Sequence, residues 1–261
     1  MRIVTSLLQL ARPYSTLLAF LSVLVPVFVR TSDIALSVER ALPLLFISIC
    51  TFVSNDLDDI DKDRINHPER PLPRGHILPS CVATFYFFSL ALALLTTRYF
   101  IPVPAAFLYY LLLILCISYH YVVDYLPAAK AAYVAAASCL PLLILAAFYP
   151  AETALYIVAV AEFAFMLGRE ICKDILDRDG DPDSILHRIP AARMAAGAFA
   201  MQSVALILLT PLLLTPYRVL EFAGMTLLLA CSYVLWFRAD RRRTATAVMK
   251  ANIFLGLSFL V

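Results

Sequence analysis

The sequence has few charged residues for its length. Asp, Glu, Lys and Arg make up 15% of its 261 residues, whereas 62% are hydrophobic. A typical soluble domain has about 25% charged residues, so this composition excludes one. Long apolar runs, such as those over 103–123, 131–148 and 153–168, approach the roughly 20 residues that cross a bilayer as a helix. We therefore predict a multi-pass integral membrane protein.

The apolar runs also lack the alternation of polar and apolar residues that a transmembrane β-barrel requires. They are continuous, which excludes a barrel. Because lipid offers the main chain no hydrogen-bond partner, each run must satisfy its own N–H and C=O groups by forming a helix. The predicted fold class is an all-α integral membrane protein.

Paired cysteines and flexible linkers are missing as well. The six cysteines show no CxxC or CxH spacing, so we interpret them as small buried apolar residues rather than as disulfides or metal ligands. No glycine-rich linker or charge run divides the chain. A single polytopic domain over residues 1–261 is therefore expected.

Nine helices are expected along the chain. They cover residues 5–29, 41–57, 78–98, 102–122, 131–149, 153–176, 191–214, 217–237 and 247–261. Lysine and arginine gather in three of the connections, at 62–74, 173–193 and 238–243. With nine spans these three connections lie on one side, which the positive-inside rule makes cytoplasmic. We expect a location in the plasma membrane of a prokaryote.

An aspartate-rich segment, NDLDDIDKDR, follows the second expected helix. Asn55, Asp59 and Asp63 are four residues apart and therefore share one helical face. Oxygen donors at this spacing suit Mg²⁺, which prefers carboxylates, waters and phosphate oxygens. A solvated acidic helix end is the alternative, but so many acidic residues beside an apolar span are costly unless something pairs with them.

A second acidic segment, REICKDILDRDGD, ends the sixth expected helix. Four of its acidic residues recur at steps of three and four and share a face: Glu170, Asp174, Asp177 and Asp181. Asp177 and Asp181 form the natural second pair of ligands for the metal. Asp174 either binds metal or forms a structural ion pair with Lys173 or Arg178.

The segment RINHPERPLPRG, which begins at Arg64, offers binding groups for phosphate. Its three prolines stiffen the backbone, and arginine presents a fork of donors that matches phosphate oxygens. Arg70 and Arg74 are candidates on equal terms. Charge on this side can also reflect membrane topology alone, so that alternative stays open.

Together the motifs resemble those of the UbiA superfamily of intramembrane prenyltransferases. The likeness rests on NDLDDIDKD, which fits NDxxDxxxD and is followed by RINHPERPLPRG, and on DRDGD, which fits DxxxD and is preceded by REICKD. The resemblance implies a bundle of nine transmembrane helices whose central cavity opens to lipid and is capped by the two motifs on the cytoplasmic side. It implies that these residues hold Mg²⁺ bridging to the diphosphate of a prenyl donor: Asn55, Asp59, Asp63, Asp174, Asp177 and Asp181.

The activity that the resemblance implies is Mg²⁺-dependent transfer of a prenyl group from an isoprenoid diphosphate to a lipophilic or aromatic acceptor, in lipid or quinone biosynthesis. The allylic C–O bond ionises, and the acceptor attacks the cation. The implied catalytic residues are Asp59, Asp63, Asp177 and Asp181. The implied diphosphate-binding residues are Arg64, Arg70, Arg74, Lys173, Tyr119 and Arg188. The second motif looks most like the branch that prenylates glyceryl phosphate ethers. No nucleic acid partner is expected.

Two places depart from the family pattern. His187 stands where relatives usually carry a basic residue, and no lysine follows Tyr119 before Lys130. His120 is either an interfacial aromatic residue or a base, and we leave it out of the predicted site.

Two other functions fit some of these features. A terpene cyclase on the same scaffold would use the same metal and diphosphate groups without an acceptor. A transporter would need acidic residues at mid-membrane depth, whereas here they cluster at one face with arginines.

Overall fold

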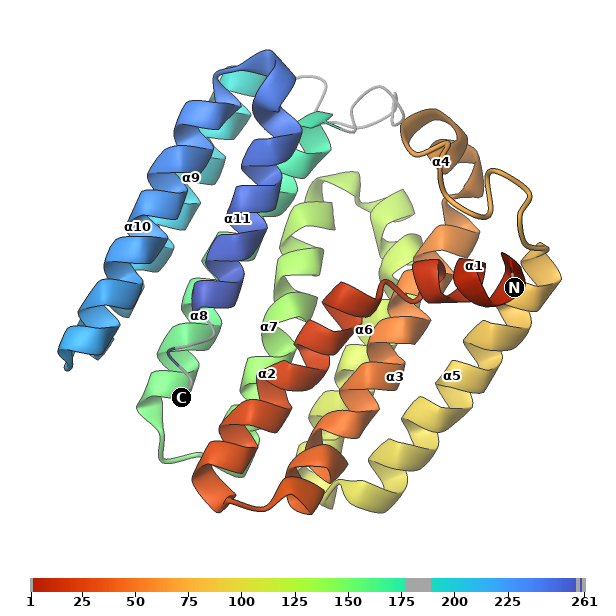
Figure 1. Ribbon diagram of the computed structural model, residues 1–261, viewed down its shortest axis with the longest axis horizontal. Helices are drawn as coiled ribbons and strands as arrows, with labels where there is room; N and C mark the ends of the chain where they lie inside the picture. The colour runs from red at the N-terminus through yellow and green to blue at the C-terminus, as the bar shows by residue number, and fades with distance from the viewer. Residues whose placement is uncertain (1, 177–188, 257–258, 260–261) are drawn as a thin grey trace. The chain divides into compact units, whose positions relative to one another are not determined.

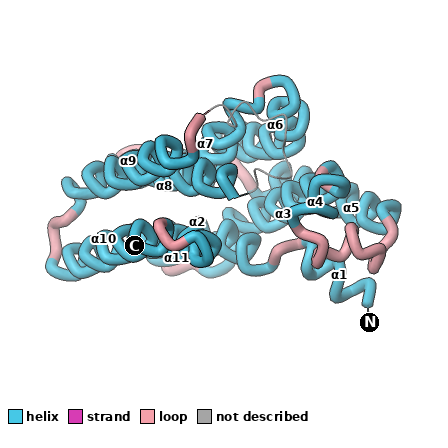
Figure 2. The backbone as a smooth tube through the Cα atoms, turned by 90° about the horizontal axis from the view of Figure 1, so that it is seen from above, coloured by secondary structure: helices cyan, strands magenta, loops and turns pink. Residues whose placement is uncertain are grey.

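The computed structural model describes residues 2–176, 189–256 and 259, and every regular element in this part of the chain is helical (Figure 2). The chain divides into two compact units, Met1–Tyr125 and Leu126–Val261. Figure 1 labels the helices of both units. The prediction of an all-α fold is thus confirmed for the described residues.

The first unit is arranged around one central helix. Its elements are α1 (Arg2–Leu10), α2 (Pro13–Thr31), α3 (Ile34–Asp58), α4 (Ile60–Asn66), α5 (Pro79–Phe100) and α6 (Val103–Tyr125). Helix α3 packs against α2, α5 and α6, and α4 extends its carboxyl end (Figure 1). The first acidic segment therefore lies at the end of the most enclosed helix of this unit.

The second unit is also arranged around one central helix. Its helices are α7 (Lys130–Phe148), α8 (Thr153–Leu176), α9 (Ala191–Leu209), α10 (Pro216–Trp236) and α11 (Arg242–Gly256), with 3₁₀ turns at Pro127–Ala129, Thr210–Leu212 and Ala239–Arg241. Helix α8 packs against α7, α9 and α11. The second acidic segment thus also begins at the end of the central helix of its unit.

Seven of the helices in the described ranges are long and apolar enough to cross a membrane: α2, α3, α5, α6, α7, α9 with its following turn, and α10. The chain is therefore a multi-pass integral membrane protein. Helix α8 is 24 residues long but carries Glu162, Arg169 and Glu170 within its length, and the described part of α11 has 15 residues. The count of nine spans stays a prediction.

The helix expected over residues 5–29 is divided in two. Arg12 adopts a left-handed conformation (φ 45°, ψ 64°) between α1 and α2, and Pro13 is the first residue of α2. Proline disfavours the helical region for the residue before it and suits the first position of a helix. The prediction of one continuous helix here was wrong because it gave this proline too little weight.

Helix α3 begins at Ile34, seven residues before the expected start. Asp33 precedes it, and its side chain accepts a hydrogen bond from the Leu36 N–H at 3.0 Å. Such an N-terminal cap satisfies a main-chain donor that the helix leaves unpaired. The extra two turns come from this cap, which the hydrophobic pattern does not reveal.

Helices α8 and α9 are in close contact at Gly168. A Cβ atom at this position would lie 2.5 Å from the Ala198 carbonyl oxygen.

We expect Gly168→Ala to lower the free energy of unfolding by about 1–3 kcal/mol, because two backbones would have to move apart. Gly197→Ala is the matched control, since no atom lies within 4 Å of its Cβ position. It should stabilise α9 by about 0.5–1 kcal/mol. Thermal unfolding in detergent measures both, and equal effects would contradict this packing.

Candidate functional site

The first acidic segment keeps its three oxygen donors in helical register across a break. Helix α3 ends at Asp58 and α4 begins at Ile60, with Asp59 between them. The Asp59 N–H nevertheless donates to the Asn55 carbonyl at 2.9 Å, and the Asp63 N–H donates to the Asp59 carbonyl at 2.7 Å. These are the i to i−4 bonds of an α-helix. The side chains at 55, 59 and 63 therefore follow one another at helical spacing, as the sequence predicts.

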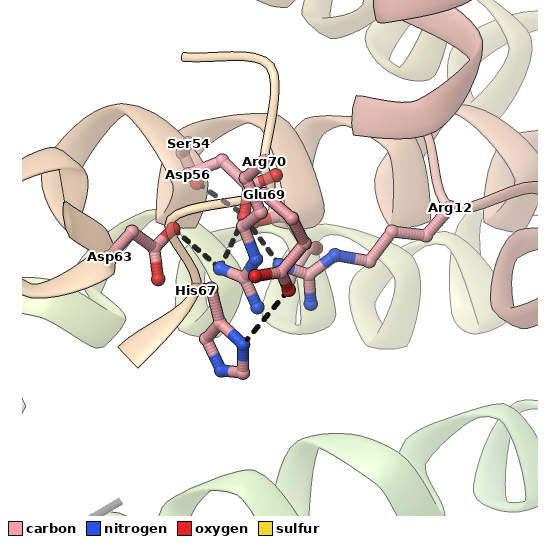
Figure 3. Close-up of polar contacts among 8 residues, drawn as sticks. Arg12, Ser54, Asp56, Asp63, His67, Glu69 and Arg70 are labelled. Carbon is pink, nitrogen blue, oxygen red and sulfur yellow. Dashed lines mark hydrogen bonds and ion pairs between the residues drawn. The ribbon is translucent and has the colours of Figure 1, made fainter. Parts of the chain in front are cut away.

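Two arginines contact Asp56 and Asp63 of this segment (Figure 3). Arg70 Nη1 lies 2.5 Å from Asp63 Oδ2 and 3.2 Å from Asp56 Oδ1. Arg12 donates to the same oxygen of Asp56, and its guanidinium lies 5.0 Å from the centre of the Phe52 ring. Asp56 and Asp63 are each only 4% exposed. Their charges are therefore compensated inside the protein rather than by solvent.

The loop before α5 presents Arg70 because apolar residues anchor the loop at two points. Leu72 and Ile77 are buried in a core cluster with Leu10, Val53 and Val82. Between these anchors the His76 N–H donates to the Pro71 carbonyl at 2.9 Å, closing a tight turn. Gly75 sits in this turn at φ 67°, a conformation that costs other residues strain. The proline-rich loop is thus folded against the core, and this positions Arg70.

The remaining candidates of the first segment are more open. Asp59 is half-buried, and its described ion pair, to Lys62 Nζ, is long at 3.8 Å. Arg64 pairs with Asp61 at 2.7 Å, but both are exposed. Arg74 is exposed as well. The structure thus separates the two arginines that the sequence left equal, since Arg70 alone of the two contacts the aspartates.

The second acidic segment is described only up to Leu176. Glu170 is buried and pairs with Arg169, while Lys173 Nζ lies 3.9 Å from Glu170 Oε2. Asp174 is 9% exposed, and Lys130 Nζ lies 2.9 Å from its Oδ1. Asp174 Oδ2 is buried without a hydrogen-bond partner among the described residues. Three predicted site residues, Asp177, Asp181 and Arg188, lie outside the described residues.

Tyr119, the last predicted site residue, is half-buried on α6 in the first unit. Sequence reasoning missed Arg12, Asp56 and Lys130. Asp56 lies three residues before Asp59 and seven before Asp63, on the same side of the helix, but a search for residues four apart passed over it. Arg12 and Lys130 are isolated cations at helix boundaries of a chain that has few charges, and this is the signal that could have found them.

The donor set of both segments fits Mg²⁺. All the candidate ligands are carboxylates or an amide, which are the hard oxygen donors that this ion takes. The half-buried carboxylate of Asp59 and the unpartnered Oδ2 of Asp174 are donors that the protein itself does not fully use. Within the described ranges, no three His, Cys, Asp or Glu residues are gathered closely enough to hold a metal ion by themselves.

Comparison with known proteins gives a family match, two curated relatives and a similar solved structure. The model of the UbiA prenyltransferase family matches residues 15–260. A digeranylgeranylglyceryl phosphate synthase of Methanosphaera stadtmanae is 24% identical over 216 residues, which is 79% of this chain and 76% of the relative. One of Methanoculleus marisnigri is 30% identical over 99 residues, 36% of each chain. A solved structure concerned with digeranylgeranylglyceryl phosphate synthase in membranes has a TM-score of 0.70 at 22% identity, covering 100% of this chain and 98% of that one. The last likeness shows the fold alone.

Proposed function

The chain belongs to the UbiA prenyltransferase family and is a prenyltransferase, and from this premise we propose a specific reaction. The protein transfers a prenyl group from an isoprenoid diphosphate to the free hydroxyl of a lipophilic glyceryl phosphate. The names of the two archaeal relatives support this acceptor, because they describe a product that carries two geranylgeranyl groups on one glyceryl phosphate. Building such a product requires a transfer to a glyceryl phosphate that already carries one such group.

One observation carries this proposal. Arg70 is held against Asp63 and Asp56 through Nη1 alone. Within the part of the chain that the structure describes, its Nη2 and Nε groups are therefore available as donors to a diphosphate. Guanidinium groups bind phosphate oxygens through parallel N–H donors. The buried aspartates fix the orientation of Arg70 before the substrate arrives, which reduces the cost of ordering the side chain on binding.

The two acidic segments hold the diphosphate together with the basic residues. Mg²⁺ would be held by Asn55, Asp59 and Asp63 of the first segment and by Asp174, Asp177 and Asp181 of the second, and when bound it neutralises charge on the diphosphate. Arg70 is the principal contact of the diphosphate within the chain, and these residues assist it: Arg64, Arg74, Lys173, Tyr119 and Arg188. Positive charge around the departing diphosphate stabilises the electron pair that it takes from the allylic carbon.

The architecture belongs to the proposal too. The chain forms one domain of nine transmembrane helices around a cavity, and both acidic segments face the cytoplasm of a prokaryotic plasma membrane. The apolar interior takes up the isoprenoid chain and keeps water away from the cation. The basic connections at 62–74, 173–193 and 238–243 support this orientation.

Release of diphosphate from geranylgeranyl diphosphate by the purified protein in detergent tests the function. We expect release that depends on added prenylated glyceryl phosphate and on Mg²⁺, and that EDTA abolishes. Phenolic acceptors and shorter prenyl diphosphates should support less turnover. Acceptor-independent release with a cyclic hydrocarbon product would instead identify a terpene cyclase, and release that persists in EDTA would overturn the metal requirement.

A further inference from the structure

The described end of α6 carries a histidine–carboxylate pair that the proposed site does not use. His120 Nε2 lies 3.1 Å from Asp124 Oδ2, one helical turn further on. The side chain of His120 is 32% exposed and that of Asp124 is 52% exposed. An imidazole that donates through Nε2 to a carboxylate keeps Nδ1 as its proton-accepting nitrogen. Nδ1 of His120 is therefore the atom of this pair that can accept a proton.

This pair lies near the first acidic segment. Helices α3 and α6 pack against each other in the first unit. Asp58, the last residue of α3, interacts electrostatically with both His120 and Asp124, and it adjoins Asp59 in the chain. Tyr86, on α5, also interacts electrostatically with Asp58. His120 therefore lies within electrostatic reach of the end of the first acidic segment.

Transfer of a prenyl group to a hydroxyl acceptor releases the hydroxyl proton, and a proton-accepting group must take it up. The C–O bond between the prenyl carbon and the diphosphate breaks, and the diphosphate leaves with the electron pair. The acceptor oxygen forms the new C–O bond to that carbon, and its O–H bond breaks. We propose that Nδ1 of His120 takes this proton, and that Asp124 holds the imidazole in position; this rests on the proposed function.

A second histidine pair at this end of the unit serves as the comparison. His67 Nδ1 lies 3.5 Å from Glu69 Oε1, and both residues lie beside Arg70 (Figure 3). Hydrogen bonding at its own main chain lowers the pKa of Glu69, with further contributions from His67 and Arg70. His67 thus has a carboxylate partner like that of His120, but its Nδ1 faces this carboxylate, so His67 is the matched control.

The test compares His120→Gln with His67→Gln in acceptor-dependent transfer across pH 5 to 8, the range in which histidine ordinarily changes its charge. A general base must be neutral to act, so transfer by the natural protein should fall as the pH falls. We expect His120→Gln to lose about 10²-fold or more of the transfer rate and to lose this fall at low pH. His67→Gln should keep the shape of the profile.

Two further measurements separate a catalytic role from a structural one. Acceptor-independent release of diphosphate should change little in His120→Gln, because that reaction does not use the acceptor proton. Imidazole added to His120→Ala should restore part of the transfer. Asp124→Asn, at an exposed position, should lose about tenfold and remain folded.

The outcomes separate this inference from the proposed function. If the natural protein transfers to no hydroxyl acceptor, the proposed function fails and this inference fails with it. If it does transfer, and His120→Gln keeps both the rate and the pH profile, the inference alone is overturned.

Discussion

Replacing Asp59 by asparagine is expected to lower prenyl transfer by about 10²–10³-fold with little change in stability. Asp59 is half-buried, and its described ion pair to Lys62 is 3.8 Å long, so the fold depends little on its charge. In the proposed site the reaction depends on that charge, because a carboxylate at this point would help to hold Mg²⁺. Initial rates at saturating Mg²⁺, measured together with thermal unfolding, separate the two effects.

Asp61→Asn is the matched control for this result. It makes the same chemical change two residues away, but Asp61 is exposed and pairs only with the exposed Arg64 among the described residues. We expect Asp61→Asn to keep its activity within about threefold and its stability within about 0.5 kcal/mol. Equal losses in the two variants would mean that the general acidity of the segment matters, rather than the face formed by Asn55, Asp59 and Asp63.

Replacing Arg70 by methionine is expected to affect both stability and activity. In this variant Asp63 would lose its ion pair, although its side chain is only 4% exposed in the natural protein. Of the two arginines that contact Asp56, only Arg12 would remain. Removing one partner of a buried ion pair costs about 3–5 kcal/mol, because the other charge stays behind. Transfer should also fall by about 10²-fold, since in the proposed site Arg70 would contribute donors to the diphosphate. Unfolding in detergent and rates at a temperature where the variant is folded measure the two effects.

Arg74→Met tests whether the effect belongs to the position or to the positive charge of the loop. Arg74 lies in the same proline-rich segment but is exposed. Its replacement should change the free energy of unfolding by no more than about 0.5 kcal/mol. A loss of stability as large as that of Arg70→Met would contradict the assignment of the buried network to Arg70.

The sequence predicts the membrane class and the helical register of Asn55, Asp59 and Asp63 well, because both depend on local spacing. Continuous apolar runs require helices in lipid, and residues four apart share a face even where α3 gives way to α4 at Asp59. The break at Arg12 was missed because the apolar residues on its two sides were assigned to one span. The conformational effect of Pro13 and the isolated charge of Arg12 mark this boundary.

The pairing of charges could not be predicted from spacing. Arg12 and Asp56 are 44 residues apart and meet because α1, the turn at Arg12 and α3 bring them together. Lys130 likewise reaches Asp174 from the start of another helix. Such contacts depend on how helices pack, and neither the positive-inside rule nor the motif pattern carries this information. The same holds for the difference between Arg70 and Arg74.

The most direct test of the central claim is mass spectrometry of the product formed from geranylgeranyl diphosphate and a prenylated glyceryl phosphate. With Mg²⁺, the natural protein should yield an acceptor whose mass has increased by one geranylgeranyl group less one hydrogen, and EDTA or Asp59→Asn should remove this product. An unmodified acceptor beside hydrolysed or cyclised donor would contradict the claim that this chain transfers the prenyl group to a hydroxyl acceptor.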